Sequence, residues 1–568
     1  MCGIWAYFIK QHLELSEAEL GKMFPVFMNT KGRGPDNHDF KVIEDKFILG
    51  FHRLAIMDPT NEGDQPFKFY DATTNTNYYC ICNGEIYNAE KLKSDYENDN
   101  THQNKYEFKS KSDCEVLIPL YIKYKEKILE HLDGVFSLII ITLKDHDYHV
   151  FACRDPFGVR PSFIGYDEKN GNLAISSEMK SLLGLFKRIE PFKPGHYLTF
   201  SNCGKEDFHY QQYHNYDYKY QLEFDRKETC RQIRLKLENA VKKRLISDRP
   251  VCALLSGGLD SSAVCAIASK ILKEQGKKLY TFSIGMKGSP DLTFAQKVAN
   301  FIGSEHTSIY VTNEICLNNK VNTIWATESF DNTTTRASNF QYLISEYIKK
   351  NTDFKVVLSG DGSDELTSGY LYNFNAPSFE KLHIEAVRKL KEIYLYDGLR
   401  ADRATSIHGL EIRVPFLDLE FVDYYLSINP EFRKPTKEFM EKSLLRESLV
   451  GYLPEEVLFR QKEAFSDGTT PIEDAWHTTG KKDAEEKFTD TEFVELSKKY
   501  LHCQPRNKEE LEYREIFDNF GFGKHDNVIP EFWPFEWTDT DDPSARTIKE
   551  LHNSNVNNES KSISGIVS

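Results

Sequence analysis

The segment "VCALLSGGLDSSAVCAIASKIL" at 251–272 restricts the fold of this chain more than any other part of the sequence. It starts with five apolar residues, passes through a turn of small residues and continues directly into an apolar pattern with helical spacing. A short, uninterrupted apolar run is typical of a strand that is buried on both faces of a parallel sheet. The segment therefore predicts one strand–turn–helix unit of an α/β fold.

The flanking segments repeat this pattern. Apolar residues spaced four apart over 233–245 predict an amphipathic helix, which Pro250 prevents from running into the strand. The apolar runs "LYTFSI" (279–284) and "FKVVLS" (354–359) predict further strands that alternate with helical stretches. This alternation predicts a doubly wound α/β domain, which we place at 225–545.

The first part of the chain has a different pattern. Short apolar runs separated by turn residues predict a strand-rich domain at 2–208. A polar, tyrosine-rich stretch at 205–221 has no clear period and is interpreted as a connection between the two domains. The polar tail at 549–568 is expected to be disordered. The clearest strand candidates in the first domain are 47–54, 78–82, 135–143 and 149–153.

Composition limits the class of protein. The 568 residues, 40% of them hydrophobic, fit a globular protein with two large domains. A net charge of −15 argues against nucleic acid or an anionic membrane as the partner, since both bind basic surfaces. The sequence has no apolar run of about 18 residues that would predict a transmembrane helix. Eleven cysteines without a CxxC pair favour a reducing compartment, so we expect the protein to be cytoplasmic.

The turn in the 251–272 segment is a candidate anion site. Ser256, Gly257, Gly258 and Ser261 lie between the predicted strand and helix, where backbone N–H groups and the helix N-terminus can hold a phosphate. The spacing is not that of a Walker loop, so transfer of a γ-phosphate is not implied. A glycine-rich turn is a weak signal by itself. Asp260 strengthens it, because a carboxylate beside a phosphate site is what bound Mg²⁺ requires.

A second acidic loop, "LSGDGSDE" at 358–365, follows another predicted strand. It supplies Asp361, Asp364 and Glu365. The simpler interpretation is an acidic turn in which Ser363 or Asp364 caps a helix. However, the carboxyl ends of parallel strands meet at one edge of a sheet, where ligands bind. Together the two loops predict a nucleotide–magnesium site that grips the pyrophosphate end, which suits adenylation.

The chain opens with "MCGIWAYF", which allows two interpretations of Cys2. In the first, Cys2 is a small apolar residue at a fraying, exposed end, before an edge strand formed by residues 4–8. In the second, Met1 is removed and Cys2 becomes an N-terminal nucleophile whose own α-amine acts as the base. The motif is too short to decide between them by itself.

Motifs along the whole chain resemble those of a known enzyme family. The first part contains "MCGI", "RGPD", "HRLAIMD", "NGEIYN" and "RDPFGVRP", which resemble class II glutamine amidotransferases. In the second part "SGGLDSS" resembles the pyrophosphate loop of ATP-pyrophosphatase domains. It is followed by "TFSIGMKGSPDL", "TTTRAS", "GLEIRVPFLD", "EKSLLRE" and "RQKEAFSDG". In this order, up to "DPSART" at 542–547, the set resembles glutamine-hydrolysing asparagine synthetase of the eukaryotic type.

The resemblance implies an Ntn-hydrolase αββα sandwich for the first domain, with Cys2 as the nucleophile that releases ammonia from L-glutamine. The side chain of Asn83 and the backbone N–H of Gly84 would form the oxyanion hole. Taken alone, "NG" is first a hairpin signal, and the acidic and basic residues could be solvated surface groups. The glutamine-binding residues that the resemblance implies are Arg53, Leu54, Ala55, Ile56, Met57, Asn83, Gly84, Glu85 and Asp113.

For the second domain the resemblance implies a PP-loop fold that activates L-aspartate with ATP as β-aspartyl-AMP. Ammonia would cross the interior from the first site, Mg²⁺ would bind Asp260 and Asp364, and the protein would be a homodimer. The role of Lys442 rests on the resemblance, since its helical context otherwise indicates a solvated face. The implied ATP-binding residues are Leu255, Ser256, Gly257, Gly258, Asp260, Ser261, Ser262, Ile284, Ser359 and Gly360. The implied residues for aspartate and the intermediate are Thr333, Arg336, Asp361 and Lys442.

One position departs from the family pattern. The family commonly has Glu where this chain has Asp361, at a position linked to forming and using the intermediate. We expect an active synthetase in which this shorter side chain tunes the reaction, since a shift of about 1 Å can change a rate about 100-fold.

Three alternatives remain. The first is another amidotransferase with the same N-terminal domain. The second is a β-lactam-forming relative with the same C-terminal domain. The third is a regulatory relative that has lost turnover, for which Asp361 is the only support. The motifs of both halves argue against the first two, and retention of every other motif argues against the third.

Overall fold

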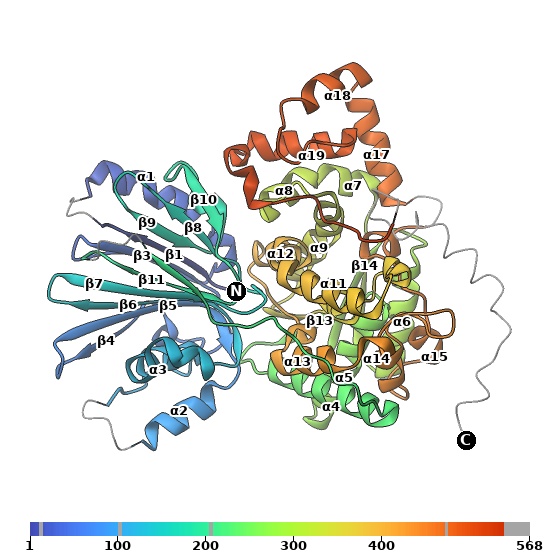
Figure 1. The fold of residues 1–568 in the computed structure, drawn as a ribbon, viewed down its shortest axis with the longest axis horizontal. Helices are drawn as coiled ribbons and strands as arrows, with labels where there is room; N and C mark the ends of the chain where they lie inside the picture. Colours follow the sequence, from blue (N-terminus) through green and yellow to red (C-terminus); the bar gives the residue numbers. More distant parts are fainter. Residues whose placement is uncertain (11–14, 100–104, 204–207, 472–474, 539–568) are drawn as a thin grey trace.

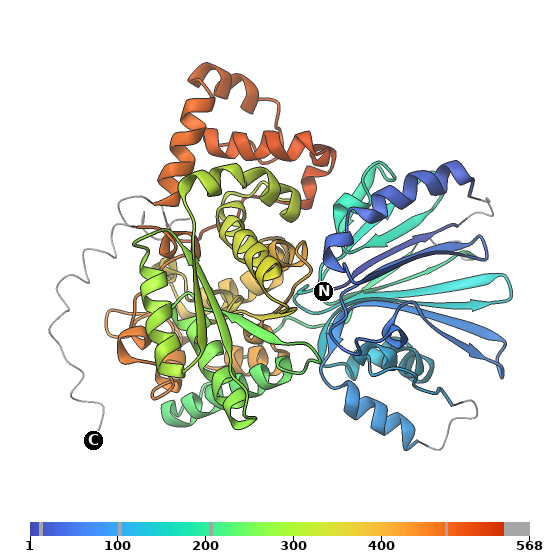
Figure 2. The same cartoon turned by 180° about the vertical axis from the view of Figure 1, so that it is seen from behind.

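The fold is described here from a computed structural model. It covers residues 1–10, 15–99, 105–203, 208–471 and 475–538. Figure 1 shows two halves side by side, with the sheet-rich N-terminal residues in blue to cyan and the helix-rich C-terminal residues in green to red. Figure 2 shows the same two halves from behind. The predicted tail at 549–568 lies outside the described residues.

The N-terminal half contains two six-stranded sheets. Their strand orders are β10-β8-β9-β1-β3-β2 and β12-β11-β7-β6-β5-β4. All pairs between neighbouring strands are antiparallel. The strands are β1 (Gly3–Phe8), β2 (Asn37–Ile43), β3 (Phe47–Arg53), β4 (Phe67–Asp71), β5 (Thr76–Ile86), β6 (Gly134–Lys144), β7 (Asp147–Arg154), β8 (Phe163–Tyr166), β9 (Leu173–Ser176), β10 (Arg188–Pro191), β11 (His196–Ser201) and β12 (His209–Gln212).

The two sheets pack face to face, and helices cover their outer faces. Ile4 and Phe47 of the first sheet share a buried cluster with Ile81 and Ile139 of the second. Helices α2 (Ala89–Glu97) and α3 (Leu117–Tyr124) pack on the outer face of the second sheet. Helix α1 (Glu17–Met28) packs on the first. This arrangement confirms the predicted αββα sandwich.

The C-terminal half is built on a five-stranded sheet of order β15-β14-β13-β16-β17, in which every neighbouring pair is parallel. The strands are β13 (Val251–Leu254), β14 (Tyr280–Gly285), β15 (Glu305–Tyr310), β16 (Val356–Leu358) and β17 (Glu411–Arg413). Strand β13 leads into α5 (Leu259–Glu274), which confirms the strand–turn–helix unit predicted for 251–272.

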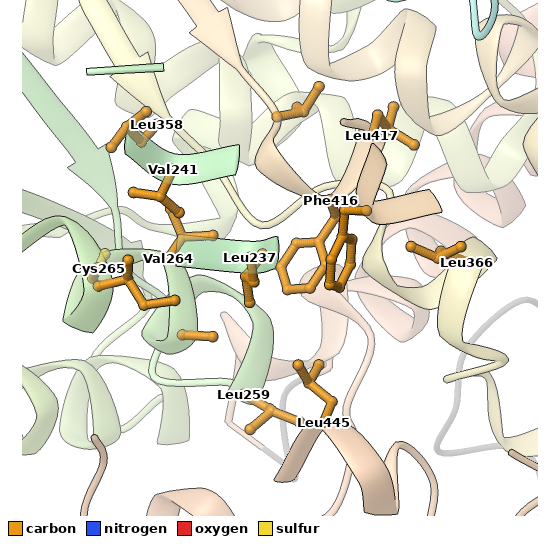
Figure 3. Close-up of a cluster of buried hydrophobic side chains, with 14 of the residues drawn as sticks. Leu237, Val241, Leu259, Val264, Cys265, Leu358, Leu366, Phe416, Leu417 and Leu445 are labelled. Carbon is orange, nitrogen blue, oxygen red and sulfur yellow. The ribbon is translucent and has the colours of Figure 1, made fainter. Parts of the chain in front are cut away.

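Helices cover both faces of this sheet, so the predicted doubly wound fold is confirmed. Figure 3 shows the cluster on one face, where Leu237 and Val241 of α4 (Arg226–Arg244) pack near Val264 and Cys265 of α5. On the other face, α9 (Asn332–Asn351) contributes Phe340 to a second cluster. The remaining helices are α6 (Pro290–Ile302), α7 (Asn313–Asn318), α8 (Lys320–Thr327), α10 (Ser363–Thr367), α11 (Phe379–Glu392), α12 (Asp397–Ser406), α13 (Leu419–Ser427), α14 (Ser443–Ser448), α15 (Glu455–Leu458), α16 (Phe465–Gly468), α17 (Trp476–Lys487), α18 (Asp490–Ser497) and α19 (Lys508–Asn519).

One local prediction is wrong, and so is one part of the first interpretation of Cys2. The stretch 205–221 is not only a connection, because His209–Gln212 form β12 at the edge of the second sheet. A four-residue edge strand with mostly exposed side chains has no alternating pattern that could reveal it. Strand β1 is not an edge strand, since it pairs with β3 on one side and β9 on the other. The domain boundaries at 2–208 and 225–545 stay predictions.

None of the helices in the described residues is long and apolar enough to cross a membrane.

Candidate active sites

The first residues of the chain lie buried between the two halves and are not a fraying end. Met1 is 1% exposed, and its amine lies 3.4 Å from Oε2 of Glu411 on β17. Cys2 is half-buried, and its Sγ accepts a hydrogen bond from the N–H of Leu54 at 3.5 Å. Burial raises the pKa of the Cys2 thiol to about 11. With Met1 in place the thiol is therefore protonated at neutral pH, and a nucleophilic role requires a base next to it.

Strand β5 brings Asn83, Gly84 and Glu85 to the same region. Asn83 is fully buried, yet neither polar atom of its side chain has a hydrogen-bond partner among the described residues. Buried amide groups are normally paired, so this side chain has donor and acceptor capacity to offer a ligand. Gly84 pairs with Phe136 of β6, and a Cβ at this position would stand 2.5 Å from Val135 O. Glycine is therefore required here by the close approach of the neighbouring strand.

Arg53 at the end of β3 is held by the turn that follows it. Its Nη1 donates to Thr60 O at 2.5 Å and to Oδ1 of Asp64 at 2.6 Å, and its Nη2 donates to Asp58 O. These bonds fix the direction of a planar donor group at the rim of the site. The loop from Leu54 to Met57 then crosses to the C-terminal half, where its side chains pack on Val251 and Val356 of the parallel sheet.

Glu85 is a buried acid and Asp113 is a half-buried one, and their charges are not equally compensated. Burial raises the pKa of Asp113 to about 6, although the N–H of Ile86 donates to its carboxylate at 2.7 Å. Burial also raises the pKa of Glu85 well above its usual range, against the attraction of Arg413, 3.0 Å away on β17. Glu411 acts electrostatically on Cys2, Glu85 and Asp113 alike. Glu411, on the edge strand β17 of the C-terminal sheet, therefore influences the charge of all three groups.

A cavity of about 200 Å³ opens at the carboxyl edge of the parallel sheet. It is bordered by the loops after β13 and β16, by α9 and by a segment near the end of the described chain. These loops come from adjacent strands, as the sequence predicts for a ligand site. The candidate site residues that border the cavity are Leu255, Ser256, Asp260, Ser261, Ile284, Thr333, Arg336, Ser359, Gly360, Asp361 and Asp364.

The turn after β13 has the geometry of an anion site. Gly257 has φ of +75°, a conformation that favours glycine, and Gly258 is the N-cap of the 16-residue helix α5. The N–H of Ser256 donates to Oγ of Ser261 at 3.1 Å, which closes the turn. An adjoining cavity of about 70 Å³ is bordered by Gly258 and Lys442 together with Ser256 and Asp260. Gly257 and Ser262 border neither cavity.

Two lysines bind the acidic side chains of the two loops. Lys442 Nζ lies 2.6 Å from both Asp260 and Asp364, and Lys462 Nζ lies 2.6 Å from the other oxygen of Asp364. These cations hold the pKa of Asp364 below its usual range despite its burial. Ser363 Oγ donates to Asp260 at 2.8 Å, so Ser363 ties the loops together rather than capping a helix. The N-cap of α10 is instead Gly362, which corrects the simpler interpretation of this loop.

Lys462 borders both cavities and was not identified from the sequence. It lies in the "RQKEAFSDG" motif, which was its only sequence signal. Arg400 on α12 was also missed: its Nη2 donates to Asp361 at 2.8 Å, and its Nε donates to Asp397 at 2.8 Å. The second oxygen of Asp361 accepts from Ser359 Oγ at 2.5 Å. Both oxygens of the short Asp361 side chain are therefore bonded.

Arg336 borders the same cavity from α9, but its charge is compensated. Its Nε and Nη2 donate to the two carboxylate oxygens of Glu509 on α19, at 3.0 and 2.6 Å. Thr333 lies one helical turn before it on the same helix. No group of three or more His, Cys, Asp or Glu side chains that could hold a metal ion occurs in the described parts of the chain.

Both halves of the chain match known protein families. The family model described as a glutamine amidotransferase domain matches residues 1–218, and the one described as asparagine synthase matches residues 232–385 and 376–527. Glutamine-hydrolysing asparagine synthetase of Rattus norvegicus is 42% identical over 580 residues, covering 96% of this chain and 98% of the relative. The Homo sapiens enzyme is 41% identical over the same shares of the two chains, and the Gallus gallus enzyme is 40% identical over 97% and 99%. The chain therefore belongs to the family of glutamine-hydrolysing asparagine synthetases, which are ligases.

Proposed function

We propose that this chain makes L-asparagine from L-aspartate with ATP, taking nitrogen from L-glutamine or ammonia through β-aspartyl-AMP. The products are AMP, pyrophosphate and, with glutamine, glutamate. The observation that carries the proposal is the pairing of two acidic, glycine-containing loops around one cavity at the carboxyl edge of the parallel sheet. This is where a doubly wound sheet binds nucleotides.

In the N-terminal half we assign Cys2 as the nucleophile. Once Met1 is removed, the α-amine of Cys2 accepts the thiol proton, and the thiolate attacks the side-chain amide of glutamine. The tetrahedral oxyanion accepts hydrogen bonds from Asn83 Nδ2 and Gly84 N–H. One such donor is worth about 3–4 kcal/mol in the transition state. The unpaired amide of Asn83 supports this role. When the intermediate collapses to the thioester, the α-ammonium of Cys2 returns its proton to the nitrogen, which leaves as ammonia. Water then hydrolyses the thioester.

We assign the remaining first-site residues to the glutamine backbone. Asp113 holds the α-ammonium and Arg53 the α-carboxylate, since a planar guanidinium suits a carboxylate. Glu85 lies beside them. The loop of Leu54, Ala55, Ile56 and Met57 forms the wall of the pocket.

In the C-terminal half we assign the turn from Ser256 to Ser262, with Gly257 and Gly258, to the ATP phosphates. Leu255, Ile284, Ser359 and Gly360 are assigned to the adenosine. Attack of the aspartate β-carboxylate on the α-phosphate releases pyrophosphate, whose charge Lys442 and Lys462 neutralise. Thr333, Arg336 and Asp361 are assigned to aspartate and the intermediate, on which ammonia displaces AMP.

Asp260 and Asp364 are assigned to Mg²⁺. Carboxylate oxygens are the ligands that Mg²⁺ prefers, and two of them face each other across Lys442. Two carboxylates do not complete the coordination of Mg²⁺, so phosphate oxygens of ATP and water molecules would supply the remaining ligands. Bound there, the ion would neutralise charge on the phosphates. A homodimer and a cytoplasmic location are part of the same proposal. The eleven free cysteines support the cytoplasmic location, because a reducing compartment keeps thiols free.

The test is formation of asparagine, AMP and pyrophosphate by the purified protein from ATP, Mg²⁺, aspartate and ammonia. We expect the three products in equal amounts. ADP and phosphate in place of AMP and pyrophosphate would contradict the adenylation step. Glutamine hydrolysis with no aspartate-dependent pyrophosphate would contradict the substrate assignment.

A further inference from the structure

The segment that ends the described chain forms one wall of the C-terminal cavity. Trp533 and Phe535 border the cavity, although they lie far along the sequence from its loops. Figure 1 shows this segment, coloured dark red, running back across the C-terminal half after α19. Its backbone is fixed at two points: Trp533 N–H donates to Asp331 at 2.8 Å, and Tyr396 donates to Glu531 O at 2.9 Å.

Lys389 on α11 contacts the aromatic rings of this segment. The side chain is almost fully buried, and Nζ lies 3.9 Å from the centroid of the Trp533 ring. Nζ also lies within 6 Å of the ring centroids of Phe535, Tyr370 and Tyr372. An ammonium at such distances is attracted to the face of each ring.

A hydrogen bond supports the same contact. Lys389 Nζ donates to Pro534 O at 2.8 Å. Burial lowers the pKa of Lys389 to about 7, and a neutral amine also donates such a bond, so the position of the segment does not depend on one protonation state. Tyr396 packs edge-on against Trp533 with ring centroids 4.4 Å apart. Lys389 and Tyr396 therefore contact the indole ring and set its orientation.

The polar atom of this indole is left unused. Trp533 is 4% exposed, and its Nε1–H has no hydrogen-bond partner among the described residues. Buried tryptophan N–H groups usually find an acceptor. A ring that borders a ligand cavity and keeps a free donor is suited to an acceptor on the ligand.

The neighbours of Trp533 include the elements to which the proposed function assigns the amino-acid substrate. Tyr370, whose ring lies 6.4 Å from that of Trp533, donates to Glu365 at 2.6 Å and to Asp397 at 3.0 Å. Asp331, which accepts a hydrogen bond from the backbone N–H of Trp533, is the N-cap of the helix that carries Thr333 and Arg336. The acceptors that an amino-acid substrate offers a lone N–H donor are its carboxylate oxygens.

We propose that Trp533 is a substrate-binding residue of the adenylating site, donating from Nε1–H to a carboxylate oxygen of the amino-acid substrate. Lys389 is a positioning residue that holds the indole in place. The inference rests on the proposed function, because it takes aspartate as the substrate of this cavity.

The test compares Trp533→Phe, which removes the N–H and keeps a ring for Lys389, with the parent protein. Asparagine synthesis from ammonia is measured at varied aspartate and at varied ATP. We expect KM for aspartate to rise at least fivefold, as for loss of one hydrogen bond to a charged group, with KM for ATP within twofold. Glutamine hydrolysis is expected to stay unchanged. Trp325→Phe is the matched control, since Lys180 lies 5.3 Å over that ring and Trp325 does not border the cavity.

Lys389 provides an independent variant. Lys389→Met should raise KM for aspartate in the same way, and Lys389→Arg should restore it, because the guanidinium keeps the cation and a donor. An unchanged KM for aspartate in both Trp533→Phe and Lys389→Met would overturn the proposal, as would a parallel rise in KM for ATP. A parent protein that makes no aspartate-dependent pyrophosphate would refute the proposed function instead.

Discussion

Replacing Gly84 by alanine is expected to abolish most glutamine hydrolysis while leaving asparagine synthesis from ammonia intact. Gly84 lies on β5 directly opposite Phe136 of β6, and its backbone N–H is one of the two proposed oxyanion donors. The added methyl group would stand 2.5 Å from Val135 O and 2.8 Å from Phe136 Cα. Both obstacles are backbone atoms, so no side-chain rotation can relieve the contact.

The size of the effect follows from these distances. Ordinary contact for a Cβ begins at 3.4 Å, so β5 and Val135 O must separate by the difference, about 0.9 Å. A misplacement of about 1 Å at a reacting centre costs about 100-fold in rate, and losing one oxyanion donor costs about 100- to 1000-fold. We therefore expect kcat for glutamine hydrolysis to fall by about 100-fold or more.

The assay measures glutamate release and, separately, ammonia-dependent asparagine formation by the same preparation. Gly21→Ala is the matched control, because a Cβ on Gly21 in α1 meets nothing within 4 Å. Glutamine hydrolysis by Gly84→Ala within about threefold of the parent would refute the reasoning. Equal loss of both activities would show that the change acts on the fold and not on the oxyanion donor.

Three further predictions concern single side chains. Asp361→Asn should lower ammonia-dependent synthesis by about 100-fold and leave glutamine hydrolysis within twofold, since it removes the charge that Arg400 and Ser359 hold. Lys462→Met should lower pyrophosphate release by about 10- to 100-fold through loss of a charged donor, and Lys462→Arg should recover part of it; full activity in Lys462→Met would contradict its role. Burial raises the pKa of Asp113 to about 6, so this side chain takes up a proton and loses its negative charge as pH falls through that value. KM for glutamine measured from pH 8 to pH 5 should therefore rise below about pH 6, whereas a flat profile would argue against a contact between Asp113 and the α-ammonium.

The parts of the fold that depend on residues close together in the sequence could be predicted from the sequence. The strand, the turn and helix α5 are consecutive, and the turn needs glycine at Gly257, where φ is +75°. Apolar periodicity and turn chemistry act over a few residues, so they can be recognised locally. The same holds for the long strands β5 and β6, whose cores are apolar.

The contacts that complete the sites could not be predicted in this way. Strand β17 has three residues, two of them charged, and no pattern reveals that it brings Glu411 and Arg413 to the N-terminal site. Trp533 reaches the C-terminal cavity only because α11 and the end of the chain pack together. Lysines are mostly solvated in proteins, so the pairing of Lys462 with an acid far away in the sequence depends on tertiary packing.

The most direct test of two cooperating sites is the fate of nitrogen in the parent protein and in Cys2→Ala. The parent is supplied with ATP, Mg²⁺, aspartate and glutamine labelled with ¹⁵N in its side-chain amide, and the label in asparagine is measured. We expect labelled asparagine from the parent, none from Cys2→Ala, and unlabelled asparagine from Cys2→Ala at the parent's rate once ammonia is added. Labelled asparagine from Cys2→Ala, or failure of ammonia to restore synthesis, would contradict the account.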